Sequence, residues 1–204
     1  MPLPPRRKKK AWAIRISNFT VLFDACVLYP APLRDFLMEL AMAGLFRAKW
    51  TDAIHEEWTR NLLKNRPELT AAKLSRTRGL MDAAVPDCLV FDYQALIPSL
   101  TLPDPDDRHV LAAAIKSRAD LILTFNLKDF PREVLDTYDI EAQHPDEFIQ
   151  HQIGLDHAKV IIAAQNCRKR LINPTCTADQ YLDTLEAQSL PLSVAELRPY
   201  AQVL

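Results

Sequence analysis

Glycine is scarce in this chain of 204 residues, which contains only three. Nearly half of the residues are apolar (49%) and a quarter are charged (25%), a balance that argues against a disordered chain and favours a helix-rich globular protein. No run approaches the ~20 consecutive apolar residues that a membrane-spanning helix requires. For this length we expect one domain with its own core and an appendage of several dozen residues.

Cysteine is also sparse, and no two cysteines form a CxxC pair. This spacing favours neither a zinc knuckle nor a disulfide framework, and it is typical of a protein of the reducing cytoplasm. The four residues are Cys26, Cys88, Cys167 and Cys176.

Positive charge is not in excess, since the formal net charge is -1. Any binding of nucleic acid must therefore rest on local basic patches. One basic run lies near the N-terminus, in residues 6–10, without the apolar core and cleavage site of a signal peptide. We interpret residues 1–18 as a solvated basic arm, with contact to RNA phosphate or anionic lipid as the alternative.

Short apolar runs alternate with helical patterns over the first three quarters of the chain. This alternation predicts an α/β core with a parallel sheet and right-handed crossovers. The sheet pattern stops near Ile140, and helical periodicity from about residue 144 predicts a helical C-terminal extension over residues 151–204. The predicted strands are 19–23, 45–50, 88–91 and 120–124, and the predicted helices start near residues 33, 52, 70 and 110.

Carboxylates follow the predicted strands or open the predicted helices. Asp24 ends the first strand, Glu57 lies early in a helix, and Asp104 and Asp107 precede an alanine-rich helix. In an open parallel sheet such positions converge at the carboxyl ends of the strands. Because clustered carboxylates repel one another, they suit Mg²⁺ or Mn²⁺, which can promote phosphodiester hydrolysis. Helix capping and chance clustering are the alternative reading.

Three motifs, in this order, resemble the PIN-domain family. The resemblance covers about residues 19–150 and is nearest to the VapC-type ribonuclease toxins of bacterial toxin-antitoxin pairs. It implies a three-layer, flavodoxin-like α/β/α sandwich and an endoribonuclease that uses Mg²⁺ or Mn²⁺ to cut structured RNA such as tRNA or rRNA. It also implies a small antitoxin partner and a homodimer. The motifs are residues 21–28 (VLFDACVL), 102–114 (LPDPDDRHVLAAA) and 123–131 (LTFNLKDFP).

The resemblance assigns catalytic and metal-binding roles to Asp24, Glu57, Asp104 and Asp107. Glu57 is preferred to its neighbour Glu56 because it lies six residues after Thr51, as in the family pattern.

The position after Thr124-Phe125 departs from the commonest family pattern, because Asn126 stands where many members have an aspartate. A neutral amide lowers the charge of the cluster, so we expect one metal ion in the free protein. Asp129 could compensate, but we interpret it as a cap for the short helix after Phe130.

Residues beside the cluster have weaker assignments. Arg108 could clamp a phosphate, and Thr124 could orient a water molecule or a carboxylate, so both are candidate RNA-binding residues. His109 is interpreted as a surface or packing residue. The extension resembles a helical region attached to this branch, and it could pack on the domain, shape the RNA cleft or meet the antitoxin.

Two other functions remain open. One is a PIN nuclease that acts in RNA maturation or on single-stranded DNA. The other is a non-catalytic α/β binding module in which the acidic cluster holds a structural or regulatory metal, a reading that Asn126 favours.

Overall fold

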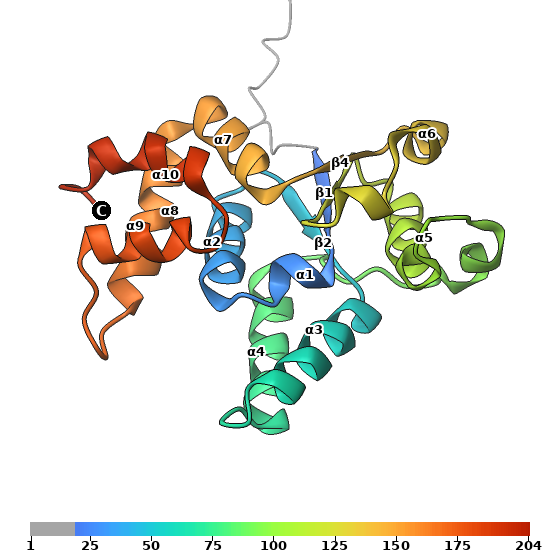
Figure 1. Ribbon diagram of the computed structural model, residues 1–204, viewed down its shortest axis with the longest axis horizontal. Helices are drawn as coiled ribbons and strands as arrows, with labels where there is room; N and C mark the ends of the chain where they lie inside the picture. The colour runs from blue at the N-terminus through green and yellow to red at the C-terminus, as the bar shows by residue number, and fades with distance from the viewer. Residues whose placement is uncertain (1–18) are drawn as a thin grey trace, which may run out of the picture.

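The sheet at the centre of the molecule consists of four parallel strands. The computed structural model describes residues 19–204, so the predicted basic arm lies outside the described residues (Figure 1). The strands are β1 (Thr20–Phe23), β2 (Arg47–Lys49), β3 (Leu121–Leu123) and β4 (Glu141–Gln143), in the order β2-β1-β3-β4. Every pairing is parallel, with Leu22 opposite Ile122 in the central pair. The predicted parallel sheet is confirmed.

Helices cover the sheet on both sides, as expected for an α/β/α sandwich. Helices α2 and α5 lie on opposite sides of the strands, while α1 and α3 lie together at one end of the sheet (Figure 1). Threonine caps start two of these helices, since Thr51 accepts from the Ile54 amide at 3.1 Å and Thr70 accepts from the Lys73 amide at 3.3 Å. The helices of this part are α1 (Ala25–Leu28), α2 (Ala31–Met42), α3 (Asp52–Asn65), α4 (Ala71–Ala84), α5 (Arg108–Ser117) and α6 (Arg132–Leu135).

The C-terminal helices form a separate group that packs against α2. This group consists of α7 (Pro145–Leu155), α8 (His157–Arg170), α9 (Ala178–Glu186) and α10 (Pro191–Leu197). Glu39 of α2 forms an ion pair with Arg170 of α8 and accepts a hydrogen bond from Asn166 at 3.1 Å. The group lies on the opposite side of the molecule from α5 (Figure 1). The predicted helical extension is confirmed.

One strand prediction was wrong, and one strand was not predicted. Residues 88–91 form no strand, and Leu89 makes only an isolated bridge to Trp50. The residues that flank this segment, Asp87 and Asp92, have φ angles of 57° and 56°, and these left-handed turns prevent an extended ladder. Conversely, β4 was missed. It is a short edge strand with the sequence EAQ, which buries too little surface to leave an apolar pattern.

No helix among residues 19–204 is long and apolar enough to cross a membrane.

Candidate active site

Asp24 is held rigidly at the point where β1 ends. Its backbone is extended, and its carboxylate caps α1 by accepting from the Ala25 amide at 2.6 Å. The second oxygen, Oδ2, accepts from the Thr124 hydroxyl at 2.7 Å and from the Cys26 thiol at 3.0 Å. With only 3% of its surface exposed, Asp24 has one fixed orientation.

Burial raises the pKa of Asp24 above its usual range. The hydrogen bonds from Cys26 and Thr124 act in the opposite direction and favour the carboxylate, while the negative charge of Glu57 raises the pKa further. Burial therefore disfavours the ionised form of Asp24, and a nearby positive charge would stabilise it.

Asp104 and Asp107 bracket the turn that leads into α5. Asp104 caps the short 3-10 helix η2 (Pro105–Asp107) by accepting from the Asp106 amide at 2.8 Å. Asp107 occupies the cap position of α5, but its side chain makes no capping hydrogen bond. The capping interpretation of the acidic residues thus holds for Asp104 and fails for Asp107, whose carboxylate is left for another role.

The pKa of Asp107 is raised to about 7, further than helix-start aspartates normally reach. The largest cause is burial, followed by the negative charges of Asp24, Asp104, Asp129 and Glu57. These carboxylates come from four separate segments of the chain, so the fold brings together the groups that the sequence predicted at the strand ends.

Glu57 points toward the same cleft from α3. Its Oε2 atom lies 3.5 Å from Nε2 of His109, a residue of α5. The charge of Glu57 also acts on both Asp24 and Asp107, whereas that of Glu56 does not appear among the causes of either pKa shift. The preference for Glu57 over Glu56 is therefore consistent with the geometry. His109 lies at the cleft rather than at a remote surface or core position.

A cleft of about 520 Å³ runs between α3 and the start of α5. Among residues 19–204, Arg60 is the only lysine or arginine that lines it, so acidic groups dominate this part of the cleft. Its lining comprises Ala53, Glu56, Glu57, Arg60, Asp104, Asp106, Asp107, His109, Asn126 and Asp129.

Asp129 belongs to this cleft, and its predicted capping role was wrong. The short helix α6 starts after Pro131, and no side chain provides its cap. Asn126 occupies the N-cap position, and Asp129 the last position, of one turn of 3-10 helix, η3 (Leu127–Asp129), whose period of three residues places them on the same side. That three-residue spacing was a usable signal for an extra carboxylate beside Asn126.

The two predicted RNA contacts differ in placement. Thr124 is completely buried and its hydroxyl orients the Asp24 carboxylate, so direct contact with RNA does not fit its position. Arg108 starts α5 but does not line the cleft, and its Nε atom is buried without a partner in the described part of the chain. A role for Arg108 with RNA stays a prediction.

The chemistry of the cleft fits a hard divalent cation. Within residues 19–204, no three His, Cys, Asp or Glu side chains are already drawn together closely enough to hold an ion. However, the mutual repulsion that raises the pKa of Asp107 is what a bound cation removes, and all the converging ligands are oxygen donors. The donor set suits Mg²⁺ or Mn²⁺ better than zinc.

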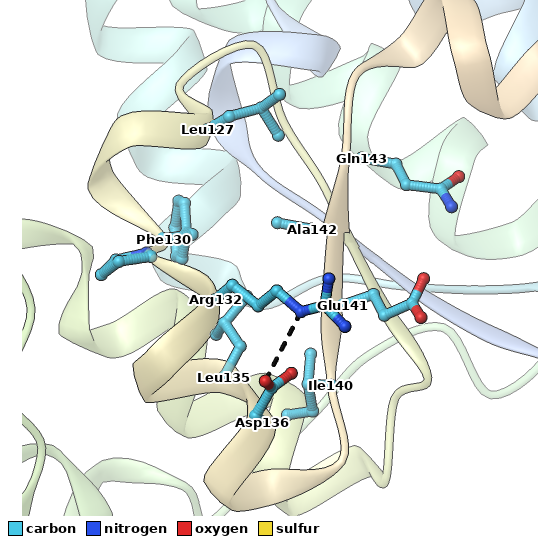
Figure 2. A pocket seen from close by; sticks show the side chains of 10 residues that line it. Leu127, Phe130, Arg132, Leu135, Asp136, Ile140, Glu141, Ala142 and Gln143 are labelled. Carbon is cyan, nitrogen blue, oxygen red and sulfur yellow. Dashed lines mark ion pairs between the residues drawn. The ribbon is translucent and has the colours of Figure 1, made fainter.

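Another hollow, of about 380 Å³, lies between α6 and β4 (Figure 2). An exposed ion pair between Arg132 and Asp136 spans 3.5 Å at its rim. Apolar side chains such as Phe130 and Leu135 also line it. None of the clustered carboxylates lines this hollow, so it has no part in the acidic site.

Comparisons with known proteins agree with the arrangement of strands and carboxylates. The PIN domain family matches residues 20–128, and the VapC50 C-terminal domain family matches residues 145–199. The chain is 36% identical over 129 residues to the Mycobacterium tuberculosis protein named "Putative ribonuclease VapC50", covering 63% of this chain and 72% of that protein. No solved structure matches. The chain belongs to the PIN-domain family, and it carries a C-terminal region of the VapC50 type.

Proposed function

We propose that this protein is a divalent-metal-dependent endoribonuclease that hydrolyses RNA phosphodiester bonds. One observation carries the proposal: carboxylates from separate segments converge on one cleft, where burial and their mutual repulsion raise the pKa of Asp107 to about 7. Such a cluster can recruit the divalent cations on which metal-dependent nucleases rely. The name of the Mycobacterium tuberculosis relative, a ribonuclease, supports the same function.

Asp24 and Asp107 would hold the ion, with Glu57, Asp104 and Asn126 as further ligands. When bound, the ion would activate a water molecule and neutralise the phosphodiester. The neutral amide of Asn126 lowers the charge of the ligand set, so we propose one ion in the free protein and a second that arrives only with RNA.

Residues of the chain itself orient the Asp24 carboxylate and set the pH at which Asp107 loses its proton. Thr124, Cys26 and the Ala25 amide fix both oxygens of Asp24, so this ligand does not need to reorganise when substrate arrives. Asp107 must lose its proton before it can bind a cation, and its raised pKa places that loss close to neutral pH. His109 holds Glu57 at the rim of the cleft through the 3.5 Å contact.

We further propose that the chain divides into a nuclease domain, predicted as residues 19–150, and an accessory region, predicted as residues 151–204. The start of α7 at Pro145 favours a boundary a few residues earlier than predicted. The similarity to VapC50 supports a role as the toxin of a type II toxin-antitoxin pair in the cytoplasm, with a small antitoxin as partner and a homodimer as the assembly. The RNA substrate would be tRNA or rRNA.

The activity is tested with the purified chain, stripped of metal and incubated with tRNA, rRNA and single-stranded DNA in parallel. We expect RNA cleavage only with Mg²⁺ or Mn²⁺, and a loss of about 100-fold or more in Asp24→Asn and Asp107→Asn. Asp136→Asn removes the same charge at the hollow beside β4 and serves as the control. Cleavage that survives both site substitutions contradicts the proposal, and preferential cleavage of DNA contradicts the substrate.

The toxin role is tested by expression in a bacterial host. Expression of the wild-type chain should arrest growth, and Asp107→Asn should remove the arrest. Co-expression of the small protein encoded beside this gene should restore growth. Growth arrest that persists in Asp107→Asn would show that toxicity does not come from this site.

A further inference from the structure

A second, smaller cavity adjoins the acidic cleft and differs from it in chemistry. Its volume is about 320 Å³, and it shares Glu57 and Asn126 with the cleft, so the two hollows are continuous. Within the described part of the chain, Glu57 is its only charged lining residue. The complete lining is Ala25, Cys26, Tyr29, Glu57, Asn61, Asn65 and Asn126.

Helix α3 builds one wall of this cavity with a regular stripe of side chains. Glu57, Asn61 and Asn65 are spaced four residues apart, so they lie on one face of the helix. At 1.5 Å per residue, the stripe extends about 12 Å from the acidic cleft along the helix axis. A strand of RNA whose phosphate lies at Glu57 would pass its neighbouring nucleotide along Asn61 and Asn65.

Two of the three carboxamides that line the cavity are available for a ligand. The side chains of Asn61 and Asn126 make no hydrogen bond within the part of the chain that the structure describes, although both line the cavity. A residue outside α3 fixes the orientation of Asn65, because its Nδ2 donates to the Tyr29 hydroxyl at 3.2 Å. Tyr29 itself lies just after α1 and offers an aromatic ring at the opposite wall.

This combination fits a nucleobase better than a phosphate. A phosphate needs cations or backbone amides, and no lysine or arginine of the described residues 19–204 lines the cavity. Carboxamides present a donor and an acceptor side by side, which match the edge of a base, adenine above all, and an aromatic ring can stack on its face.

We propose that this cavity, lined by Tyr29, Asn61 and Asn65, binds the base of a nucleotide next to the scissile phosphate and determines the sequence preference of cleavage. The proposal rests on the proposed ribonuclease function. It assigns the acidic cleft to the phosphate and the carboxamide-lined cavity to the base.

The test compares cleavage of short RNAs that differ in one base at each position around the cleavage site. The wild-type chain should prefer one base, with adenine expected, at a position adjacent to the cut. Asn61→Ala and Asn65→Ala should each reduce that preference by about five-fold or more. Tyr29→Phe retains the ring but removes the hydroxyl that orients Asn65, so it should weaken the preference less than Asn65→Ala.

Lys64→Gln is the control, because it alters an exposed residue of the same helix that does not line the cavity. Any loss of phosphate contact there would reduce cleavage of all the RNAs equally. Circular dichroism of each variant verifies that α3 is intact. Unchanged base preference in Asn61→Ala and Asn65→Ala would overturn the inference while leaving the ribonuclease function in place.

A binding measurement separates the inference from the proposed function. Fluorescence anisotropy with a labelled adenine-containing trinucleotide, in EDTA, reports on the cavity without cleavage. Asn61→Ala should weaken this binding by about five-fold or more relative to the wild type and Lys64→Gln. If the wild-type chain cleaves no RNA, the proposed function fails, and equal binding by wild type and Asn61→Ala overturns the cavity assignment separately.

Discussion

Thr124 donates its hydroxyl to Oδ2 of Asp24 across 2.7 Å and thereby ties the end of β3 to the end of β1. The Thr124 side chain is completely buried, and its hydroxyl also accepts the Asn126 amide at 2.9 Å. One side chain therefore positions both a carboxylate of the proposed site and the loop that carries Asn126. Thr124 is a positioning residue because it acts through Asp24.

Thr124→Val should change the pH dependence of cleavage. The hydrogen bond from Thr124 lowers the pKa of Asp24, so its removal raises that pKa further. We expect the acidic limb of the pH-rate profile to move to higher pH, and activity measured on that limb to fall by about ten-fold for each pH unit that the limb moves. Thr124→Ser keeps the hydroxyl and should retain the wild-type profile. A uniform loss of activity at every pH would instead indicate a merely structural role.

Asp107 should destabilise the metal-free protein at neutral pH. Its pKa is about 7 in the folded chain against an ordinary value of 3.8, so between these values the folded state binds more protons than the unfolded state. Stability of the metal-free protein therefore falls as pH rises from about 4 to 7. In EDTA at about pH 7.5, Asp107→Asn should be more stable than the wild type by roughly 1 kcal/mol after solvent screening.

Thermal unfolding in EDTA and in Mg²⁺ measures both effects. Mg²⁺ should raise the melting temperature of the wild type and leave that of Asp107→Asn nearly unchanged. Equal responses of the two proteins to Mg²⁺ would remove Asp107 from the proposed ligand set.

Asp129→Asn should weaken metal binding and lower the pKa of Asp107. Asp129 lines the acidic cleft, and its charge is one of the causes that raise the pKa of Asp107. We expect the pH midpoint of Mn²⁺ binding to move downward, while the affinity at high pH falls because one negative charge is lost. Calorimetric titration with Mn²⁺ at several pH values on both sides of neutrality measures both. Asp136→Asn, outside the cleft, should change neither quantity.

The elements predicted correctly from the sequence have either a local signal, such as a helix cap, or side chains that are buried on both faces of the sheet. Strands β1 and β3 are buried along their whole length, and Thr51 caps the start of α3 as its sequence position predicts. Residues 88–91 carry the same apolar character, but the left-handed turns at Asp87 and Asp92 are invisible in an apolar pattern. Strand β4 was missed for the opposite reason, because a polar edge strand has no apolar alternation.

The proposed site shows the same contrast between local sequence signals and orientations that depend on tertiary packing. Asp24 and Asp107 were predictable from their places at a strand end and before a helix, together with the family motifs. The role of Asp129 depended on the 3-10 turn after Asn126, and the stripe of Asn61 and Asn65 depended on which face of α3 meets the cleft. Such orientations are set by tertiary packing, which a single sequence does not display.

His55 should stay neutral below the usual pKa of histidine. Its side chain is fully buried, and burial lowers its pKa. The Trp58 indole donates to Nδ1 at 3.0 Å, so the proton must lie on Nε2, which faces Asp82 at 3.0 Å. Protonation of Nδ1 would place its hydrogen against the hydrogen that the Trp58 indole donates, which disfavours the charged imidazolium. Because the folded pKa is lowered from 6.5, His55 costs stability as pH falls through 6.5 toward that lowered pKa.

Ring resonances of His55, followed by NMR from about pH 4.5 to about pH 8, measure this protonation directly on both sides of the ordinary histidine pKa. We expect a titration midpoint below 6.5. A midpoint at or above 6.5 would show that the Asp82 charge outweighs burial.

Asp146 should be the residue on which the C-terminal helices depend most. It lies in the first turn of α7, is buried, and accepts from the backbone amides of Leu192 and Ser193 at 2.8 Å each and from the Ser193 hydroxyl at 2.7 Å. These bonds hold the first turn of α10, where a negative charge is also favoured. Asp146→Asn retains the size but loses the charge and one acceptor, so the free energy of unfolding should fall by about 2 kcal/mol.

Ser193→Ala removes only the hydroxyl donor and should cost about 1 kcal/mol. Hydrogen exchange distinguishes local from global effects. Because Asp146 contacts α10 and not the acidic cleft, exchange should accelerate in α10 and α9 of Asp146→Asn while β1 and α3 remain protected. Equal acceleration in all these elements would mean that the C-terminal helices and the sheet unfold as one unit, and the accessory region could then not be removed without unfolding the nuclease domain.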